Sequence, residues 1–186
     1  MRPFENPYVP TSQFSPEFDE LIALYRDLKP MTVLEIGTMH GGTLWHWIHQ
    51  APDGARVMNI DPLMTHTPGM DLLRMWKSWA REGIEFKTIV GMSHDVRVWA
   101  MALEWLGGEI DFLFIDGDHT YRGAKRDWDL YAERAKVVAF HDLIQHRPHF
   151  GIHKLFKELK DEGLETREFY SQGNQSGGGI GVVFNE

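Results

Sequence analysis

Polar and acidic side chains stand at the ends of five short apolar runs. These polar segments occupy residues 35–43, 61–62, 91–95, 116–119 and 141–142. If the apolar runs are parallel strands, their carboxyl ends meet at one edge of a sheet, where ligands bind in open α/β folds. Burying a carboxylate without a partner costs several kcal/mol, so this many acidic ends predict a shared polar ligand or ion.

The first segment is a glycine-rich turn, in which Gly37, Gly41 and Gly42 let the backbone pass close to a ligand. It is not a P-loop, because no Gly-Lys-Ser/Thr follows it. It is not the dinucleotide motif G-x-G-x-x-G, because Met39 stands at the second glycine position, where pyrophosphate must approach the backbone. A tight turn without any ligand explains these glycines about as well.

Asp61 ends the second apolar run. A carboxylate at this place can accept two hydrogen bonds from a ribose diol, both in NAD enzymes and in S-adenosylmethionine enzymes. Because Pro62 follows it, Asp61 could instead only cap a turn.

The elements that position these segments are read from the hydrophobic pattern. Short runs with β-branched residues predict strands, and the longer stretches between them predict crossover helices. We expect strands at residues 32–36, 56–60, 85–90, 110–115 and 136–140, and helices at 42–50, 71–82, 94–106 and 121–135, the last capped by Thr120. This alternation predicts a three-layer α/β domain with a parallel sheet.

Further elements flank this core. Residues 1–14 are expected to form a surface arm, followed by a helix with Ser15 as its N-cap and ended by Pro30. A helix from Ile152 to about Glu162 precedes a strand at 166–170, and 179–184 closes the sheet as an antiparallel hairpin partner. We therefore predict one domain over residues 1–186, with seven strands that are mostly parallel and an extra N-terminal helix.

The segments VLEIGTMHGGTLW and FIDGDHTYRGAKRDWDLY, with an acidic end to the second strand and the later VVAFHDL, resemble class I S-adenosylmethionine-dependent methyltransferases. More narrowly, they resemble the small-molecule O-methyltransferases that include the cephalosporin hydroxylase-like proteins and the macrolide-sugar O-methyltransferases. The resemblance runs from about Val33 to Asp142 and implies a Rossmann-like sandwich. It also implies methyl transfer to a hydroxyl of a small molecule.

The resemblance implies a set of cofactor-binding residues. In the family, the acidic residue that ends strand one orders the glycine-rich loop and faces the methionine part of S-adenosylmethionine. The loop surrounds this part of the cofactor. The acid ending strand two binds ribose, and the pair after strand three contacts adenine. The matching residues here are Glu35, Gly37, Thr38, Gly42, Asp61, Met92, Ser93 and Asp116.

The same resemblance implies a metal and a base. Asp116, His141 and Asp142 match the three positions that hold a divalent metal in metal-dependent members, and His119 matches a general base, so His119 and Asp116 are the candidate catalytic residues. The family usually has an acidic residue where this chain has His141. Histidine with two carboxylates would favour Mn, Fe or Zn over Mg. Alternatively the metal is absent and His141 is itself a polar or catalytic group.

Other residues carry weaker expectations. Asp118 could be a metal ligand, but it is rather expected to be a turn residue that caps the helix starting near Tyr121. His146, His149 and His153 have helical spacing, but Pro148 and Gly151 break a helix there, so a loop that closes over substrate is expected rather than a ligand set. Trp76 and Trp79 are candidates for a substrate wall or a dimer contact.

Composition excludes several classes. The 186 residues include 19 Lys+Arg and 27 Asp+Glu, a net charge of −8 that argues against a nucleic-acid partner. Cysteine is absent, so there is no thiolate site or disulfide. No apolar run approaches the roughly 20 residues of a membrane span, and the N-terminus does not resemble a targeting signal. A cytoplasmic protein is expected.

The short chain leaves little wall for an acceptor, so we expect a homodimer. Two alternatives to a methyltransferase stay open: a non-catalytic protein that binds S-adenosylmethionine or a nucleotide, and, less favoured, an NAD-type oxidoreductase.

Overall fold

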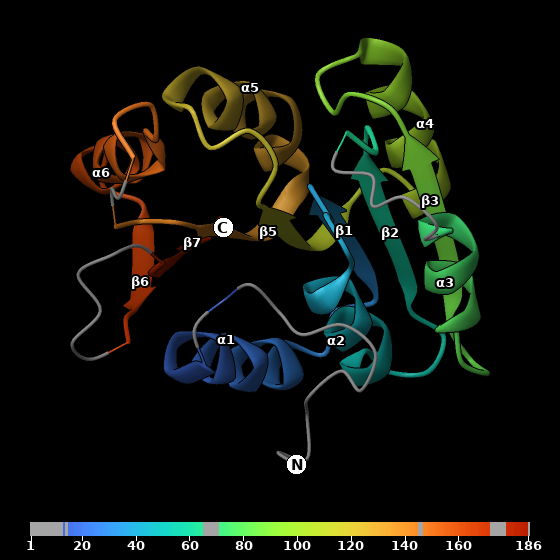
Figure 1. Cartoon of the computed structure of the whole chain (residues 1–186). Coiled ribbons are helices and arrows are strands. Elements are labelled where there is room, and N and C mark those ends of the chain that lie inside the picture. Colours follow the sequence, from blue (N-terminus) through green and yellow to red (C-terminus); the bar gives the residue numbers. More distant parts are fainter. Residues whose placement is uncertain (1–12, 14, 65–70, 145–146, 172–177, 186) are drawn as a thin grey trace.

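The structure of the chain is a computed structural model, which describes residues 13, 15–64, 71–144, 147–171 and 178–185 (Figure 1). The predicted surface arm at residues 1–14 lies outside this part, apart from Gln13. No helix in the described ranges is long and apolar enough to cross a membrane.

Seven strands form one sheet in the order β3-β2-β1-β4-β5-β7-β6. Neighbours from β3 to β5 are parallel, whereas β7 is antiparallel to both β5 and β6. The predicted sheet, mostly parallel with an antiparallel last strand, is confirmed. The strands are β1 (Thr32–Ile36), β2 (Arg56–Asp61), β3 (Glu85–Val90), β4 (Ile110–Ile115), β5 (Ala135–His141), β6 (Glu165–Phe169) and β7 (Ile180–Phe184).

Helices cover both faces of the sheet, which makes the three layers visible in Figure 1. One face carries α1 (Ser15–Leu28), α2 (Gly42–Gln50) and α3 (Leu72–Ser78). The other carries α4 (Val96–Leu106), α5 (Tyr121–Tyr131) and α6 (Ile152–Asp161), and a 3₁₀ turn η1 (Ala132–Arg134) joins α5 to β5.

The strands are apolar on both faces because each face has its own helical layer to pack against. In β1, Leu34 and Ile36 point to the core beneath α4–α6, whereas Val33 points to the core beneath α1–α3. In β4, Leu113 and Phe112 divide in the same way. Because side chains alternate between the two cores, each strand is packed on both faces, and the strand ends at one edge of the sheet are held in fixed positions.

Helix α1 is fixed to the far end of the sheet through Glu17, whose side chain is fully buried. Its Oε1 accepts a hydrogen bond from the Gly179 N–H at 3.0 Å, and its Oε2 accepts bonds from the Ser171 N–H and hydroxyl, both at 3.2 Å. The N-terminal helix therefore holds the segments that flank β7 and follow β6.

Three helices differ from their predicted bounds. The helix predicted at 71–82 spans only Leu72–Ser78, and the one predicted from 94 begins at Val96. The starts of both helices are set by Asp71 and Asp95, N-caps whose carboxylates accept backbone N–H bonds. The helix predicted to reach 135 ends at Tyr131, because η1 turns the chain into β5.

Candidate active site

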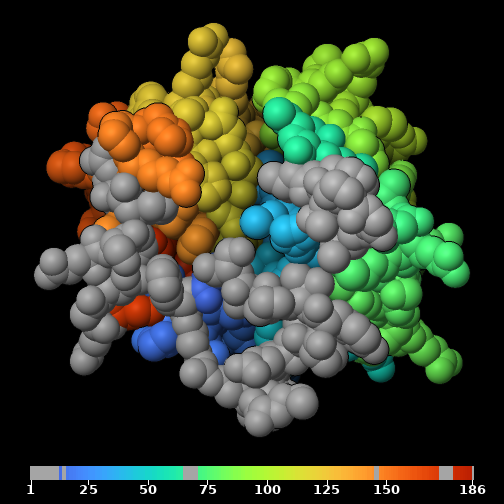
Figure 2. Space-filling view, viewed as in Figure 1, coloured from blue at the N-terminus to red at the C-terminus, as the bar shows by residue number. Residues whose placement is uncertain are grey.

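A cavity of about 460 Å³ opens at the carboxyl ends of the parallel strands. It lies where β1 and β4 are neighbours and the strand order reverses, the usual ligand position in such sheets. Its walls come from the turns after β1 to β4 and from α5. In Figure 2, light-blue atoms that follow β1 are recessed between the yellow atoms of α5 and green atoms on the other side.

The glycine-rich turn lies against the segment that follows β4. Gly37 has a φ of +84°, and a Cβ at this residue would lie 2.4 Å from the Asp116 carbonyl oxygen. Gly41 has a φ of +93°, and a Cβ at this residue would lie 2.5 Å from Trp76 Nε1. The same Nε1 donates a hydrogen bond to the His40 carbonyl oxygen at 3.1 Å. Only glycine allows both close approaches.

Trp76 and Trp79 are buried at 0% and 5% exposure in the core beneath α1–α3. Their rings pack against the glycine-rich turn. The prediction of a substrate wall or a dimer contact for these two residues is therefore wrong, since the turn itself needs them as packing partners.

Glu35 orders the glycine-rich turn from beneath. Its fully buried carboxylate accepts hydrogen bonds from the hydroxyls of Thr43 and Thr38 and from Trp47 Nε1. Burial outweighs these bonds and raises the pKa of Glu35 to about 8. Glu35 and Gly42, the first residue of α2, stand behind the cavity wall rather than in it.

Asp61 joins the end of β2 to the same turn. Its Oδ2 accepts bonds from the N–H groups of Thr38 at 2.7 Å and Met39 at 3.0 Å, and its Oδ1 accepts one from Leu63 N–H at 2.6 Å. Asp61 and Thr38 both line the cavity. A carboxylate has about four acceptor positions, so Asp61 can still bind a ligand.

Met39 has a φ of +52° and its side chain lines the cavity. It thus takes the backbone conformation of a glycine at the place where a dinucleotide site requires one. A side chain here limits the approach of a pyrophosphate to the turn.

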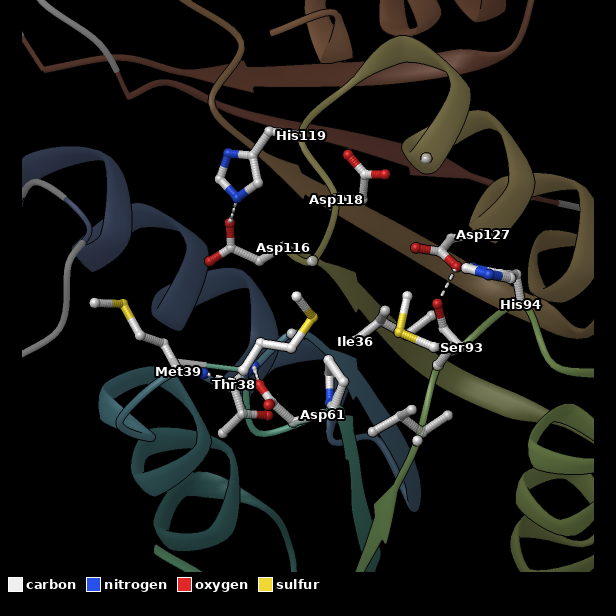
Figure 3. Close-up of a pocket in the computed structure, with 18 residues that line it drawn as sticks. Ile36, Thr38, Met39, Asp61, Ser93, His94, Asp116, Asp118, His119 and Asp127 are labelled. Atoms are coloured by element: carbon white, nitrogen blue, oxygen red, sulfur yellow. Dashed lines mark hydrogen bonds and ion pairs between the residues drawn. The ribbon is translucent and has the colours of Figure 1, made fainter. Parts of the chain in front are cut away.

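The segment after β3 forms the end of the cavity next to α5. Met92 and Ser93 line it, and the Ser93 hydroxyl donates to Asp127 Oδ1 at 2.5 Å (Figure 3). The Ser93 carbonyl oxygen accepts a bond from the Tyr131 hydroxyl at 2.8 Å. Burial raises the pKa of Asp127 to about 6, although the Ser93 bond acts in the opposite direction.

Two histidines and two aspartates meet where β4 and β5 end. His119 Nδ1 lies 2.7 Å from Asp142 Oδ2, and its Nε2 lies 3.4 Å from Asp116 Oδ1. His141 Nδ1 lies 3.1 Å from the same Asp116 oxygen. The other Asp116 oxygen accepts a bond from Gln13 Nε2 at 2.8 Å. Asp116 and His119 line the cavity, so this cluster borders it.

The charges of this cluster stabilise each other. Burial disfavours the imidazolium of His141, but the carboxylates of Asp116, Asp142 and Glu17 raise its pKa to about 9. His119 has a raised pKa for the same reason: its bond to Asp142 and the charge of Asp116 outweigh burial. Burial opposes the charge on Asp142, yet the His119 bond keeps the pKa of Asp142 below its usual value.

The predicted metal ligands Asp116, His141 and Asp142 do come together, but as ion pairs. Within the described ranges, no group of three or more His, Asp or Glu side chains is arranged to hold a metal ion. The carboxylate oxygens of Asp116 and Asp142 instead face nitrogens of His119 and His141. In this arrangement the four residues do not fit a divalent metal.

The other polar residues considered from the sequence form a turn and a helix cap, or lie on the loop before α6 and on α6 itself. Asp118 accepts the Thr120 N–H at 3.0 Å, which confirms the predicted turn, and Thr120 caps α5 by accepting the Gly123 N–H at 3.0 Å, as predicted. The cap of α5 is thus Thr120 and not Asp118. His149 is exposed and His153 is half-buried on α6, whereas His146 lies outside the described residues.

Asp127, Gln13 and Glu17 were not predicted from the sequence. For Asp127 a signal existed: it shares the buried face of its helix with Ala124 and Tyr131, at spacings of three and four residues. Gln13 and Glu17 gave no comparable signal, because their partners lie more than a hundred residues away along the chain.

Comparison with known proteins places this site in a family. The model of the family described as "Methyltransferase domain" matches residues 34–143. Uncharacterized protein R132 of Acanthamoeba polyphaga mimivirus is 30% identical over 120 residues, which cover 63% of this chain and 53% of R132. The chain thus spans about half the length of this curated relative.

Two solved structures share the fold. The O-methyltransferase from Bacillus cereus in complex with SAH has a TM-score of 0.68 at 19% identity, covering 95% of this chain and 84% of that chain. The O-methyltransferase TomG from Streptomyces achromogenes, involved in tomaymycin synthesis and in complex with SAM, has a TM-score of 0.66 at 15% identity, covering 96% and 82%. Since the family model spans the glycine-rich turn, Asp61, Asp116 and Asp142, the chain belongs to the methyltransferase-domain family.

Proposed function

We propose that this chain is an S-adenosylmethionine-dependent O-methyltransferase that acts on a hydroxyl of a small molecule of the sugar or natural-product type. The observation that carries the proposal is that one cavity joins Asp61 and Ser93 at one part of its wall to Asp116 and His119 at another. The SAH complex of the Bacillus cereus enzyme and the role of TomG in tomaymycin synthesis support it.

The cavity suits the donor in size and charge. Its volume of about 460 Å³ lies within the roughly 300–1,000 Å³ typical of small-molecule sites. Asp61, Asp116, Asp118 and Asp127 line it, whereas its cationic candidates are two histidines. An acidic wall favours a cationic sulfonium over the neutral product, which helps product release. We assign the ribose to Asp61 and the adenine to Met92 and Ser93.

His119 is the proposed general base. A carboxylate only accepts hydrogen bonds, so the 2.7 Å contact with Asp142 places the proton of a neutral His119 on Nδ1. Nε2 then carries no proton and can take that of the acceptor hydroxyl. When bound, S-adenosylmethionine supplies an electrophilic methyl group whose C–S bond breaks as the new O–C bond forms. No metal is needed to balance this step.

The neighbours of His119 stabilise the imidazolium that the step creates. Asp142 faces its Nδ1, and Asp116 Oδ1 lies 3.4 Å from its Nε2. The ring of Phe150 packs against the imidazole at 4.6 Å between centroids. Positioning by these contacts supplies the main acceleration, because methyl transfer to a held hydroxyl needs no covalent participation by the protein.

Calorimetry and a transfer assay test this proposal. The wild-type chain is titrated with S-adenosylhomocysteine and, separately, with NAD, and methyl transfer from labelled S-adenosylmethionine is measured on a panel of sugars, phenols and vicinal diols. We expect binding of S-adenosylhomocysteine, none of NAD, and transfer to at least one hydroxyl class. His119→Ala is expected to lower kcat by roughly 10²–10⁴-fold, with donor affinity unchanged.

His49→Ala is the matched control, since this imidazole stacks on Trp45 on α2 and does not line the cavity. Absence of any heat with S-adenosylhomocysteine would refute the proposal. Binding without transfer to any class would favour a non-catalytic binding protein. Equal loss of donor affinity and turnover in His119→Ala would make His119 a structural residue.

A further inference from the structure

Asp127 is a buried acid that the proposed reaction does not use. It projects from the inner face of α5 into the cavity wall and is 2% exposed. Ser93 donates to its Oδ1, and this is the one hydrogen bond that its carboxylate accepts within the described part of the chain. Figure 3 shows the second oxygen turned away from Ser93. A carboxylate so deeply buried with one bond is costly unless a ligand donates another.

The side chains of Asp127 and Ser93 present only acceptor atoms to a ligand. The Ser93 hydroxyl uses its only proton on Asp127, so it offers only lone pairs to a ligand. The Ser93 backbone is anchored by the Tyr131 hydroxyl at 2.8 Å, which fixes the position of both acceptors. Asp127 Oδ2 and Ser93 Oγ therefore form an acceptor pair that suits an N–H donor and repels a carbonyl oxygen.

Purine bases differ in the substituent at position 6. Adenine carries a 6-amino group, which donates, whereas hypoxanthine and guanine carry a 6-oxo group, which accepts. Building on the proposed donor site, we infer that Asp127 is a specificity-determining residue that accepts a hydrogen bond from the 6-amino group of adenine and rejects 6-oxo purines. The apolar Ile36, Ile60 and Met92 side chains of the same cavity are available to contact the base.

The charge state of Asp127 is compatible with this role. Burial and the nearby Asp118 carboxylate raise its pKa to about 6, while the Ser93 bond lowers it. Above that pH the group is ionised and is an acceptor only. An Asn at this position keeps the shape and the Ser93 contact through Oδ1, but it presents Nδ2–H in place of the second oxygen.

The test compares two ligands that differ only at this atom. Dissociation constants are measured by calorimetry at about pH 8, above the pKa of Asp127, for S-adenosylhomocysteine and for S-inosylhomocysteine, its 6-oxo analogue. The wild type is expected to prefer the adenosyl compound at least roughly tenfold, since a site built for an N–H donor rejects an acceptor. Asp127→Asn is expected to abolish or reverse this preference.

Asp129→Asn is the control, because this exposed aspartate on the same helix pairs with Lys125 at the surface and does not line the cavity. Ser93→Ala removes one acceptor of the pair but leaves the Asp127 carboxylate in place, so it is expected to keep part of the adenosyl preference. If Asp127→Asn fails to fold, the proposal is tested by the ratio of the two dissociation constants in the wild type and in Ser93→Ala.

Equal wild-type affinities, or an unchanged ratio in folded Asp127→Asn, would overturn the role of Asp127 while leaving the methyltransferase proposal standing. Complete loss of the preference in folded Ser93→Ala would also overturn it, because the Asp127 carboxylate is still present in that variant. A wild type that binds neither compound would overturn the proposed function and this inference with it.

Discussion

His119 and Asp142 are joined by a 2.7 Å contact although 23 residues separate them in the chain. They meet because β4 and β5 are parallel neighbours, so the turns at their carboxyl ends lie side by side. Asp142 has a φ of +62°, a left-handed conformation that aims its carboxylate at His119 Nδ1 and at the Gly178 N–H. This pairing leaves His119 Nε2 directed at Asp116 and the cavity.

Asp142→Asn tests Asp142 as a positioning residue. Asparagine tolerates positive φ, so the variant is expected to fold. It removes the charge that stabilises the His119 imidazolium, and we expect kcat to fall by about 10²-fold or more, with the donor dissociation constant unchanged. Kinetics that separate kcat from KM, with calorimetry, measure both quantities.

Asp161→Asn is the control for Asp142→Asn, because Asp161 is exposed and pairs with Lys157. A fall in thermal stability that matches the loss of activity would show that Asp142 acts only on the fold.

Gly37→Ala tests the close approach of the glycine-rich turn to the segment after β4. The new Cβ would lie 2.4 Å from the Asp116 carbonyl oxygen at a φ of +84°. We expect the free energy of unfolding to fall by about 2–5 kcal/mol. Roughly 1–2 kcal/mol of this comes from the left-handed backbone conformation and about 1–3 kcal/mol from overpacking. Urea unfolding measures it, and donor affinity is expected to fall as well.

Gly163→Ala separates strain from clash. Gly163 has a φ of +90° but nothing lies within 4 Å of an added Cβ. In this variant the free energy of unfolding is therefore expected to fall only by the cost of the left-handed backbone conformation, about 1–2 kcal/mol. Equal losses in the two variants would contradict the importance of the contact with Asp116.

Glu35→Gln tests the protonation of the buried acid beneath the turn. The pKa of Glu35 is about 8 in the folded chain, against an unfolded value near 4.5. The folded wild type thus binds the proton more tightly, so this contribution to its stability is complete below about pH 4.5 and is lost as the pH rises through about 8.

The Gln variant lacks this contribution. The difference in free energy of unfolding, variant minus wild type, is therefore expected to rise between about pH 4.5 and 8 and then to level off. Urea unfolding of both proteins across this range measures the difference, in which other titrating groups cancel. Parallel stability curves would show that Glu35 is ionised when buried.

Removal of metal ions tests the paired cluster. Because the nitrogens of His119 and His141 face the carboxylates of Asp116 and Asp142, we expect chelation to leave turnover and thermal stability unchanged. Dialysis against EDTA, metal analysis and re-addition of Mn²⁺ or Mg²⁺ check this. Activity that EDTA abolishes and Mn²⁺ restores, but not in His141→Ala, would support the metal site that the resemblance implies.

The fold could be predicted because strand and helix signals agree along the chain. The run at 110–115 is apolar at nearly every position and matches β4, since both of its faces are covered. The first residues of α3 and α4 were harder to predict, because single side chains decide them: Asp71 and Asp95 bind backbone N–H groups just inside the predicted helices. Periodicity does not report such bonds.

The candidate site was predictable where chemistry follows strand ends, as at Asp61, Ser93, Asp116 and His119, all of which line one cavity. It was missed at Asp127, although this residue shares a helix face with Ala124 and Tyr131, because an aspartate within a helical stretch usually faces solvent. The ion pairing of His141 also depends on side-chain directions that the sequence does not give. The homodimer, the cytoplasmic location and the single-domain boundary stay predictions.

The position of β7 has a consequence for how the chain acquires its shape. β6 borders only β7, and β7 alone connects it to β5. In a chain that folds as it is synthesised, β6 therefore has no strand to pair with until β7 follows, and Glu17 of α1 meets its partners Ser171 and Gly179 only at this late stage. The earlier strands can assemble while translation proceeds, but one flank of the molecule closes only when β7 arrives, and until then β6 is a site where aggregation can begin.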